Sequence, residues 1–301
     1  MKNIIVFGYG YEGTIIAKQI HNNPGCHFWG FADNSPFKQG FFSYGYPIRD
    51  IYELTKLNNE IDFSVIIASK AYDEIIEQCR EHDLKIEGVY FGGEIHYYPF
   101  ATFESLDYTK DIRLYAGDIY DSMHYNMENL YGLSINRWDE KHIFHDIRKP
   151  YPLPEKSIMG YEAEDVFEYV ERKELIGVID EIYRILKPGG CLRICMPDYN
   201  SPYIKMRAMS DSDGRVIFDA GGGGTITEKG IVNGGQVYFA TYEDFQIILE
   251  GTMFRNIEWL CYYSKKGNKI KKHISSNNGY LNRVNYETDG EDYCLVVDCY
   301  K

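Results

Sequence analysis

The sequence predicts an α/β protein built on parallel sheets, and three observations support this fold class. An apolar run at residues 4–7 passes through closely spaced glycines into a helical pattern. Strand-like and helix-like segments then alternate as far as residue 91, which is typical of a parallel sheet. An amphipathic helix at residues 175–186 ends at Lys-Pro-Gly-Gly and leads into an apolar run at residues 191–196. Since proline cannot continue a helix and paired glycines allow a positive-φ turn, this order predicts helix, turn and strand.

Length and charge limit the organisation of the chain. Its 301 residues exceed the roughly 100–200 of a usual domain, so we expect two domains, at residues 1–95 and 112–301, joined by a linker at 96–111. A formal net charge of −13 argues against a nucleic-acid partner, because binding phosphates needs clustered Lys and Arg. The first apolar run is too short to span a bilayer and no signal-cleavage pattern follows it, so we expect a cytoplasmic protein.

Seven cysteines occur without a CxxC pair or a disulfide-like spacing. We expect them to be small buried residues in a reducing compartment, and we expect no metal site. The 28 tyrosines suit stacking on a carbohydrate or a nucleotide, but they also fill ordinary cores and interfaces.

A glycine pattern separates the first expected strand from the first expected helix, with Gly8, Gly10 and Gly13 in the spacing GxGxxG. This spacing allows a tight turn, close approach of a phosphate to the helix N-terminus and close helix packing. The second strand ends at Asp33, where an acid can accept hydrogen bonds from a ribose. These four residues predict a Rossmann-like domain that binds a nucleotide. The alternative is that the glycines only shape a turn in a domain used for docking or dimerisation.

Further elements complete the first domain. Helices are expected at residues 50–57 and 73–82, and strands at residues 27–32, 63–68 and 89–91. The phrases VFGYGYEG, WGFADNSP and VIIASKAYDEII resemble N-terminal nucleotide-binding modules of bacterial polysaccharide-biosynthesis proteins. This resemblance implies NAD or a nucleotide-sugar near the glycine pattern. No motif places a proton-transfer group beside a nicotinamide, so oxidoreductase chemistry is less favoured.

The second expected domain carries a more specific phrase, LIGVIDEIYRILKPGGCLRICMPD, at residues 175–198. It resembles the segment before the fifth strand of class I S-adenosylmethionine (SAM) dependent methyltransferases, particularly a bacterial group of sugar and surface-polysaccharide pathways. The phrases GYLNRVN and DYCLVVDCYK resemble the end of that family, where a substrate-side loop leads into a final antiparallel strand. The resemblance implies a class I methyltransferase-like sheet over residues 112–301, with SAM as cofactor.

The resemblance also implies cofactor-binding residues. Gly117 and Asp118 follow the strand at 113–116, where the family has a glycine-rich loop under SAM, although this chain keeps a single glycine. Asn136, or Ser134 nearby, stands where relatives have an acid that binds the ribose. Asp146 would accept a hydrogen bond from the adenine amino group. The alternative for Asp146 is a turn or helix cap.

Candidate catalytic acids lie after the expected fourth strand, in residues 158–170, where relatives have two histidines near a Glu. Here Asp165 and Tyr169 take approximately those positions, and Glu168 is retained. Methylation of a hydroxyl needs a proton acceptor, and Glu164 or Asp165 would serve if partly desolvated. The alternative is that both are ordinary acids on the surface.

Three further features lie nearer the C-terminus. Residues 221–224 are four consecutive glycines, which predict either a mobile lid or a plain flexible insertion. Tyr238–Leu249 resembles a helix entry of the family, with Gln236 in place of a histidine. Arg283 would meet an anionic group such as a sugar-nucleotide phosphate, or form a surface ion pair.

Two functional hypotheses follow. The first is a SAM-dependent methyltransferase that acts on a sugar or nucleotide-sugar in surface-polysaccharide biosynthesis. The second is a catalytically silent, methyltransferase-like binding or scaffold protein that uses its N-terminal nucleotide site. A NAD-dependent sugar dehydrogenase or epimerase is a weaker third reading, because it leaves the second domain unexplained. Whether the protein is an enzyme stays open, and a homo-oligomer is compatible with the sequence.

Overall fold

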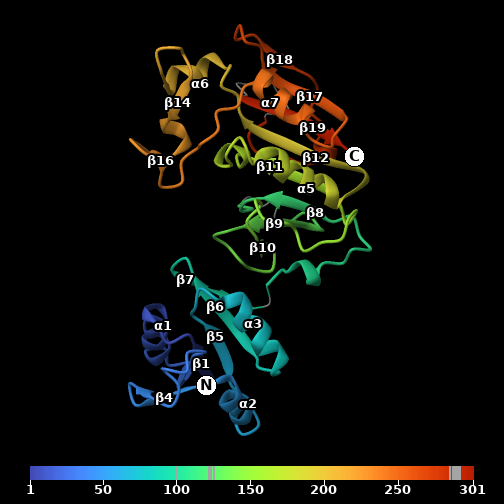
Figure 1. Ribbon diagram of the computed structural model, residues 1–301. Coiled ribbons are helices and arrows are strands. Elements are labelled where there is room, and N and C mark those ends of the chain that lie inside the picture. The colour runs from blue at the N-terminus through green and yellow to red at the C-terminus, as the bar shows by residue number, and fades with distance from the viewer. Residues whose placement is uncertain (99, 121–123, 125, 285, 287–292) are drawn as a thin grey trace. The chain divides into compact units, whose positions relative to one another are not determined.

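The computed structural model describes residues 1–98, 100–120, 124, 126–284, 286 and 293–301. The chain forms two compact units, each with its own sheet (Figure 1). Unit 1 comprises Met1–Phe100 and Asn136–Glu140, and unit 2 comprises Ala101–Ile135 and Lys141–Lys301. The expected mixed α/β fold with parallel-rich sheets is confirmed. The domain limits drawn from the sequence stay predictions, and they assign residues 136–140 to the second domain, whereas these residues cluster with unit 1.

Unit 1 contains a seven-stranded sheet in the order β3-β4-β2-β1-β5-β6-β7. Its strands are β1 (Lys2–Phe7), β2 (Cys26–Ala32), β3 (Phe42–Ser43), β4 (Tyr46–Arg49), β5 (Ser64–Ile67), β6 (Ile86–Phe91) and β7 (Glu94–Tyr97). Its helices are α1 (Tyr11–His21), α2 (Ile51–Asn58) and α3 (Tyr72–Glu81). The five central strands are parallel, and β3 and β7 are antiparallel edge strands. The strand order reverses between β1 and β5, and in doubly wound sheets the carboxyl ends at such a reversal form a ligand crevice.

The expected helices of unit 1 are present, and local capping explains one boundary. The side chain of Asp50 accepts a hydrogen bond from the backbone N–H of Glu53, while the Glu53 side chain accepts from the backbone N–H of Asp50. This reciprocal pair satisfies donors that the first turn of α2 leaves free. The strands β3, β4 and β7 were not expected from the sequence.

Unit 2 contains an eight-stranded sheet in the order β10-β9-β8-β11-β12-β19-β17-β18. Its strands are β8 (Arg113–Ala116), β9 (Leu130–Ser134), β10 (His142–Phe144), β11 (Ile158–Glu164), β12 (Leu186–Pro197), β17 (Asn256–Tyr263), β18 (Lys269–Lys271) and β19 (Cys294–Tyr300). The first five strands in this order are parallel, whereas β19 is antiparallel to both β12 and β17. The expected final antiparallel strand is therefore confirmed. The order reverses between β8 and β11, so a second crevice is expected at the carboxyl ends of these two strands.

Helices and hairpins complete unit 2. The helices are α5 (Leu175–Ile185), α6 (Pro202–Arg207) and α7 (Tyr242–Glu250), and the 3-10 turns are η1 (Phe103–Ser105), η2 (Phe167–Tyr169), η3 (Ala220–Gly222) and η4 (Ser276–Asn278). Two small hairpins pair β13 (Ala208–Ser210) with β14 (Val216–Asp219), and β15 (Thr225–Thr227) with β16 (Gly230–Val232). In Figure 1 the segment from α6 to β16 lies to one side of the large sheet.

The four consecutive glycines have defined surroundings in this segment. A Cβ on Gly222 would lie 2.4 Å from Oε1 of Gln236, and a Cβ on Gly224 would lie 2.5 Å from Cα of Gly235. Both separations are shorter than real Cβ contacts, so these glycines permit close packing. The lid expected here stays a prediction.

The Lys-Pro-Gly-Gly sequence does not separate helix from strand as expected. β12 begins at Leu186, which pairs with Ile158, and the next pair joins Cys191 to Gly160. The extra residues form a bulge in which Gly189 has a φ of +81°, a backbone conformation that glycine adopts without strain. The expected turn is therefore an irregularity within β12.

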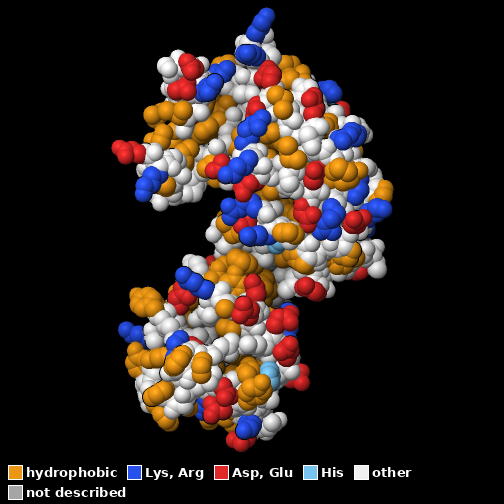
Figure 2. All heavy atoms as spheres, in the orientation of Figure 1, with side chains coloured by type: hydrophobic (Ala, Val, Ile, Leu, Met, Phe, Trp, Pro, Cys, Tyr) orange, Lys and Arg blue, Asp and Glu red, His pale blue; other side chains and the backbone are white. Residues whose placement is uncertain are grey.

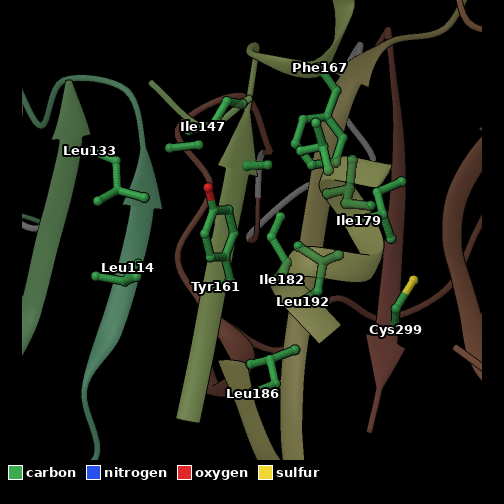
Figure 3. Close-up of a cluster of buried hydrophobic side chains, with 14 of the residues drawn as sticks. Leu114, Leu133, Ile147, Tyr161, Phe167, Ile179, Ile182, Leu186, Leu192 and Cys299 are labelled. Atoms are coloured by element: carbon green, nitrogen blue, oxygen red, sulfur yellow. The ribbon is translucent and has the colours of Figure 1, made fainter. Parts of the chain in front are cut away.

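One face of the unit 2 sheet is apolar and is covered by α5. Figure 3 shows Leu114, Tyr161 and Leu192 on three neighbouring strands beside Ile179 and Ile182 of the helix. All five are buried. Side chains alternate across a strand, so the residues next to Leu114, Tyr161 and Leu192 along each strand point to the opposite face of the sheet.

The opposite face carries a row of buried charged groups. Arg193 donates from Nε and Nη2 to the two carboxylate oxygens of Asp298 at 2.7 Å each, and both side chains are 1% exposed. Arg113 donates from Nε to Glu162 Oε1 at 3.0 Å. Nη1 of Arg193 also donates to two backbone carbonyls of the segment 275–279. The row therefore holds this segment against the sheet.

All seven cysteines are free and six of them are buried, in agreement with the sequence prediction. In the part of the chain that the structure describes, no group of three or more His, Cys, Asp or Glu side chains could hold a metal ion. None of the helices among the described residues has both the length and the apolar character needed to cross a membrane.

Candidate functional site

The carboxyl ends of β8 and β11 form the best candidate site of unit 2. Gly117 follows β8 with a φ of +100°, and its backbone N–H donates to the carbonyl of Leu133 at 2.8 Å. A Cβ on Gly117 would meet only Val166, at an ordinary 3.5 Å, so the space in front of this glycine is open. Asp118 is half-buried and accepts a hydrogen bond from the Tyr120 hydroxyl at 2.6 Å. The predicted cofactor residues Gly117 and Asp118 therefore lie at the expected crevice.

The loop after β8 has a donor that is already used. The backbone N–H of Ile119 donates to Nε2 of the fully buried His142 at 2.8 Å. The imidazole lies against Gly132, where a Cβ would be 2.5 Å from His142 Cδ2. In a glycine-rich loop that binds a phosphate or carboxylate, such a backbone N–H would donate to the ligand. Here it donates to a histidine of β10 instead.

Asp146 follows β10, as expected, but it is paired with Arg148. Arg148 donates to its carboxylate from Nε at 2.9 Å and 3.1 Å, from Nη2 at 2.6 Å and from its backbone N–H at 3.0 Å. Hydrogen bonds from Arg148 hold the pKa of Asp146 below its usual value. The backbone bond also fits the alternative interpretation of Asp146 as a turn cap.

The other two ribose candidates lie at and just after the end of β9. Asn136 belongs to the segment that clusters with unit 1. Ser134 is buried at the end of β9. The predicted roles of both residues stay predictions.

Glu164 ends β11 and anchors a loop. Its carboxylate accepts from the backbone N–H groups of Asn282 at 3.0 Å and Arg283 at 2.7 Å, from the Asn282 amide at 3.4 Å and from the Tyr115 hydroxyl at 3.2 Å. Burial raises its pKa, and the backbone hydrogen bonds oppose this effect. These contacts explain Glu164 as a structural anchor, whereas its predicted catalytic role stays a prediction.

Asp165 is the next residue and has a strained backbone, with a φ of +53°. Its Oδ2 accepts from Nε of Arg283 at 2.7 Å. Oδ1 is buried, and none of the described residues donates a hydrogen bond to it. Strained residues with unsatisfied polar atoms are frequent at functional sites, so Asp165 is the stronger of the two predicted catalytic acids.

Glu168, in η2, has a buried carboxyl group that is only partly hydrogen-bonded. Its Oε1 lies 3.3 Å from Nε2 of Gln236, while its Oε2 has no hydrogen-bond partner among the described residues. Burial and, to a smaller extent, the negative charge of Asp165 raise the pKa of Glu168 to about 8, while Arg283 opposes the shift. A carboxyl group with such a pKa can hold or release a proton near neutral pH.

Gln236 connects Glu168 to a second set of buried side chains. Its Oε1 lies 2.6 Å from the Tyr199 hydroxyl, which also lies 2.9 Å from Oδ2 of Asp219. Asp219 further accepts from Nε and Nη2 of Arg207, so it is an acceptor and takes the single phenolic proton. The side-chain amide of Gln236 donates from Nε2 to Oε1 of Glu168, and this hydrogen bond opposes the rise in the pKa of Glu168.

A hollow of about 970 Å³ lies beside this site, along the loop anchored by Glu164. Arg283 borders the hollow and also pairs with Asp165. Tyr280 and Tyr286, which stack with ring centroids 5.2 Å apart, also line it. Polar groups beside aromatic rings suit a carbohydrate or a nucleotide.

In unit 1 the three predicted glycines have two different roles. A Cβ on Gly8 would lie 2.2 Å from the carbonyl oxygen of Ala68, and a Cβ on Gly13 would lie 1.9 Å from that of Gly8. Both glycines are therefore required by the protein's own packing. Gly10, which precedes α1, has nothing within 4 Å of an added Cβ, so this position is open to a ligand.

Asp33 lies next to these glycines, as expected, but its oxygens are engaged. Oδ2 accepts from the backbone N–H of Tyr9 at 2.8 Å and from Nζ of Lys38 at 2.9 Å, and Oδ1 accepts from the backbone N–H of Ser35 at 2.8 Å. A ribose at this acid would have to displace Lys38. The structure brings Gly8, Gly10, Gly13 and Asp33 together, while their ligand stays a prediction.

Sequence reasoning did not name two important side chains of the unit 2 site as site residues. Glu168 was recognised only as a retained family acid, and Gln236 only as a replacement for a histidine. Their positions, 68 residues apart, gave no sign of the contact between them. The one available signal was that Glu168 lies in a segment that matches the family in outline, and that Gln236 precedes a helix entry that resembles the family.

Comparisons with known proteins give structural similarity without sequence similarity. No family model matches the sequence, and no curated protein matches it. The chain is similar to a SAM-dependent methyltransferase, a possible histamine N-methyltransferase, from Thermotoga maritima, with a TM-score of 0.37 and 14% identity over 64% of this chain and 82% of the other. SAM-dependent methyltransferases from Mesorhizobium loti (TM-score 0.35, 14% identity, 66% and 94% coverage) and Archaeoglobus fulgidus (0.34, 14%, 84% and 95%) are also similar. At these values the similarities do not by themselves assign an activity to the chain.

Proposed function

We propose that unit 2 binds SAM at the carboxyl ends of β8 and β11 and methylates a sugar or nucleotide-sugar of surface-polysaccharide biosynthesis. The main support is the reversal of strand order between β8 and β11, with the open Gly117 after β8. After β11, Asp165 and Glu168 each have a buried carboxyl oxygen for which the described residues supply no hydrogen-bond partner. In α/β sheets, such a reversal is where ligands bind. The strongest sequence phrases of the methyltransferase family lie on α5 and β12, next to β11 in the same sheet, and on β19.

At this edge of the sheet, Gly117 and Asp118 fit SAM as they stand, whereas Asp146 would first have to give up its ion pair with Arg148. Gly117 leaves open space, and Asp118 beside it is half-buried and polar. Asp146 would hold the adenine amino group only after exchanging its ion pair with Arg148, which is on the surface and therefore weak. A bound SAM supplies a methyl group on a positively charged sulfur as the electrophile.

The chain's own residues would position the acceptor. The hollow beside Arg283 holds a sugar against Tyr280 and Tyr286. Asp165 and Glu168 orient the attacking group, and Glu168 accepts its proton when its own carboxyl is ionised. Holding two reactants in line accounts for much of the rate of a displacement, so one carboxyl base is sufficient.

Unit 1 is proposed as a Rossmann-like domain that binds NAD or a nucleotide-sugar. Its support is the open space at Gly10 directly before α1, together with Asp33 at the end of the neighbouring strand. Backbone N–H groups at a helix N-terminus favour a phosphate. A nucleotide-sugar here would connect unit 1 with the proposed substrate class.

A silent binding protein is the second candidate, and specific contacts favour it. The backbone N–H of Ile119 is used by His142, and the carboxylate of Asp146 is used by Arg148. Two groups that would grip SAM are thus occupied by the protein itself. A chain that had lost methyl transfer would tolerate both contacts.

Calorimetry with SAM separates the two candidates. We expect saturable heat for the wild-type protein and weaker binding for Gly117→Ala, whose methyl group enters the open space. Gly214→Ala is the matched control, because Gly214 also has a positive φ and open surroundings but lies in the β13–β14 hairpin connection. No heat at millimolar SAM with folded protein would overturn the methyltransferase proposal.

A further inference from the structure

The site in unit 2 contains two carboxyl oxygens for which the described residues supply no donor, Asp165 Oδ1 and Glu168 Oε2. Glu168 is 1% exposed, so its free oxygen is buried within the protein. A buried polar atom without a partner costs about 1–3 kcal/mol, so such atoms usually have a ligand, a water or a catalytic role. The two groups are close enough for the charge of Asp165 to raise the pKa of Glu168.

We propose that Asp165 and Glu168 together bind the protonated amino group of an amino sugar. This inference rests on the proposed function, since it specifies which sugars the unit 2 site accepts. An ammonium group has three N–H donors, whereas a hydroxyl group has one. Two acceptor oxygens that both lack a donor among the described residues, on residues three positions apart, therefore match an ammonium better than a hydroxyl.

The charges around the site support a cationic ligand. The titratable and charged groups that interact with Glu168 are Asp165 and Tyr169 of the same stretch, Tyr199 after β12, and Arg283. With Glu168 protonated, Asp165 and Arg283 neutralise each other. With Glu168 ionised, the cluster has one negative charge in excess, which one ammonium group would neutralise.

Binding would therefore be coupled to a proton. An arriving ammonium favours the ionised form of Glu168, and the carboxyl proton leaves to solvent. The Gln236–Tyr199–Asp219 contacts lead from Glu168 toward Arg207, whose side chain is 43% exposed. A neutral sugar offers no such charge, so its binding should release no proton from Glu168.

The test uses glucosamine and glucose as probes on the full chain, by calorimetry near pH 7. We expect glucosamine to bind at least about tenfold more tightly than glucose, the ratio that one charge-assisted hydrogen bond supplies. Glu168→Gln and Asp165→Asn should each reduce this preference by about tenfold or more. Glu171→Gln is the matched control, because Glu171 is an exposed acid three residues from Glu168.

Proton release gives a readout that a merely structural role would not change. Repeating the titration in buffers of different ionisation enthalpy should show protons released by the wild-type protein and none by Glu168→Gln. If Glu168→Gln does not fold, Asp165→Asn tests the same preference, because the Asp165 side chain is 37% exposed and tolerates an isosteric change.

The outcomes separate this inference from the proposed function. Equal binding of glucose and glucosamine overturns the inference, even when SAM binds. Competition between SAM and glucosamine also overturns it, because the carboxyl groups then belong to the cofactor's own amino group. A preference for glucosamine without any SAM binding supports the amine site and overturns the methyltransferase proposal.

Discussion

Units 1 and 2 each place a glycine directly after the first strand of a parallel sheet, but they use the adjoining loop differently. In unit 1, Gly8 and Gly13 pack against backbone atoms and leave Gly10 open before an eleven-residue helix. In unit 2, Gly117 is open, while the amide of Ile119 is taken by His142. The difference teaches that a strand followed by a glycine defines a crevice, whereas the partners of the loop amides decide what can bind there.

The largest expected effect distinguishes the packing glycines of unit 1 from the open one. Gly13→Ala should lower the free energy of unfolding of unit 1 by about 4 kcal/mol or more, because its Cβ would lie 1.9 Å from a carbonyl oxygen. Gly10→Ala should cost less than about 1 kcal/mol and weaken nucleotide binding. Urea denaturation measures the change in the free energy of unfolding for both variants. A stable Gly13→Ala protein would contradict the assigned packing role.

The second effect is a pH dependence specific to unit 2. Glu168 has a folded-state pKa of about 8 against an ordinary 4.5, so the folded protein retains a proton that the unfolded chain releases. Stability should therefore fall as pH rises from about 4.5 to about 8, by at most about 1.4 kcal/mol per pH unit, and level off above. Denaturation across this range should show the decline in the wild-type protein and a weaker one in Glu168→Gln. Identical profiles would show that Glu168 is ionised throughout.

The third effect tests the loop amide that distinguishes the two units. His142→Ala removes the acceptor of the Ile119 N–H and should destabilise unit 2 by about 1–3 kcal/mol. If SAM uses this amide, added SAM should raise the melting temperature of His142→Ala more than that of the wild-type protein. His21→Ala, an exposed histidine of unit 1, is the control and should change neither value. If SAM shifts the melting temperature of both proteins equally, the Ile119 amide is not part of the cofactor site.

The smallest effect concerns the surface pair at Asp146. Arg148→Ala should change stability by less than about 1 kcal/mol, since the pair is exposed, and should return the pKa of Asp146 toward its usual value. The freed carboxylate should bind SAM a few-fold more tightly. Arg172→Ala breaks a similarly exposed pair with Asp244 and should leave SAM affinity unchanged. Weaker SAM binding by Arg148→Ala would show that the arginine itself contacts the ligand.

The sequence predicted the helices of unit 1 and its strands β1, β2, β5 and β6, because their periodicity and caps are local. Asp50 before α2 and Gly10 before α1 are signals that need no knowledge of the fold. The strands β3 and β4 were missed, since β3 has two residues and β4 contains a proline. Such short segments pair only because a neighbouring strand is already in place.

The site was predicted less completely, because its contacts join distant parts of the chain. The phrase with Glu164 and Asp165 located the correct end of β11. It could not show that the carboxylate of Glu164 would accept hydrogen bonds from backbone N–H groups 118 and 119 residues away. It also could not show that Arg148 would cover Asp146, because the direction of a surface arginine is set by rotamers and solvent. The burial that raises the pKa of Glu168 exists only in the folded unit.

The position of β19 has a consequence for the order of folding. This strand lies between β12 and β17, and its Asp298 pairs with Arg193, which is 105 residues earlier. Closing so long a loop is entropically costly, and proteins rich in distant contacts fold slowly. Until residues 294–300 emerge from the ribosome, a nascent chain keeps two unpaired sheet edges and an uncompensated arginine. We therefore expect unit 2 to mature last and to depend most on chaperones during synthesis.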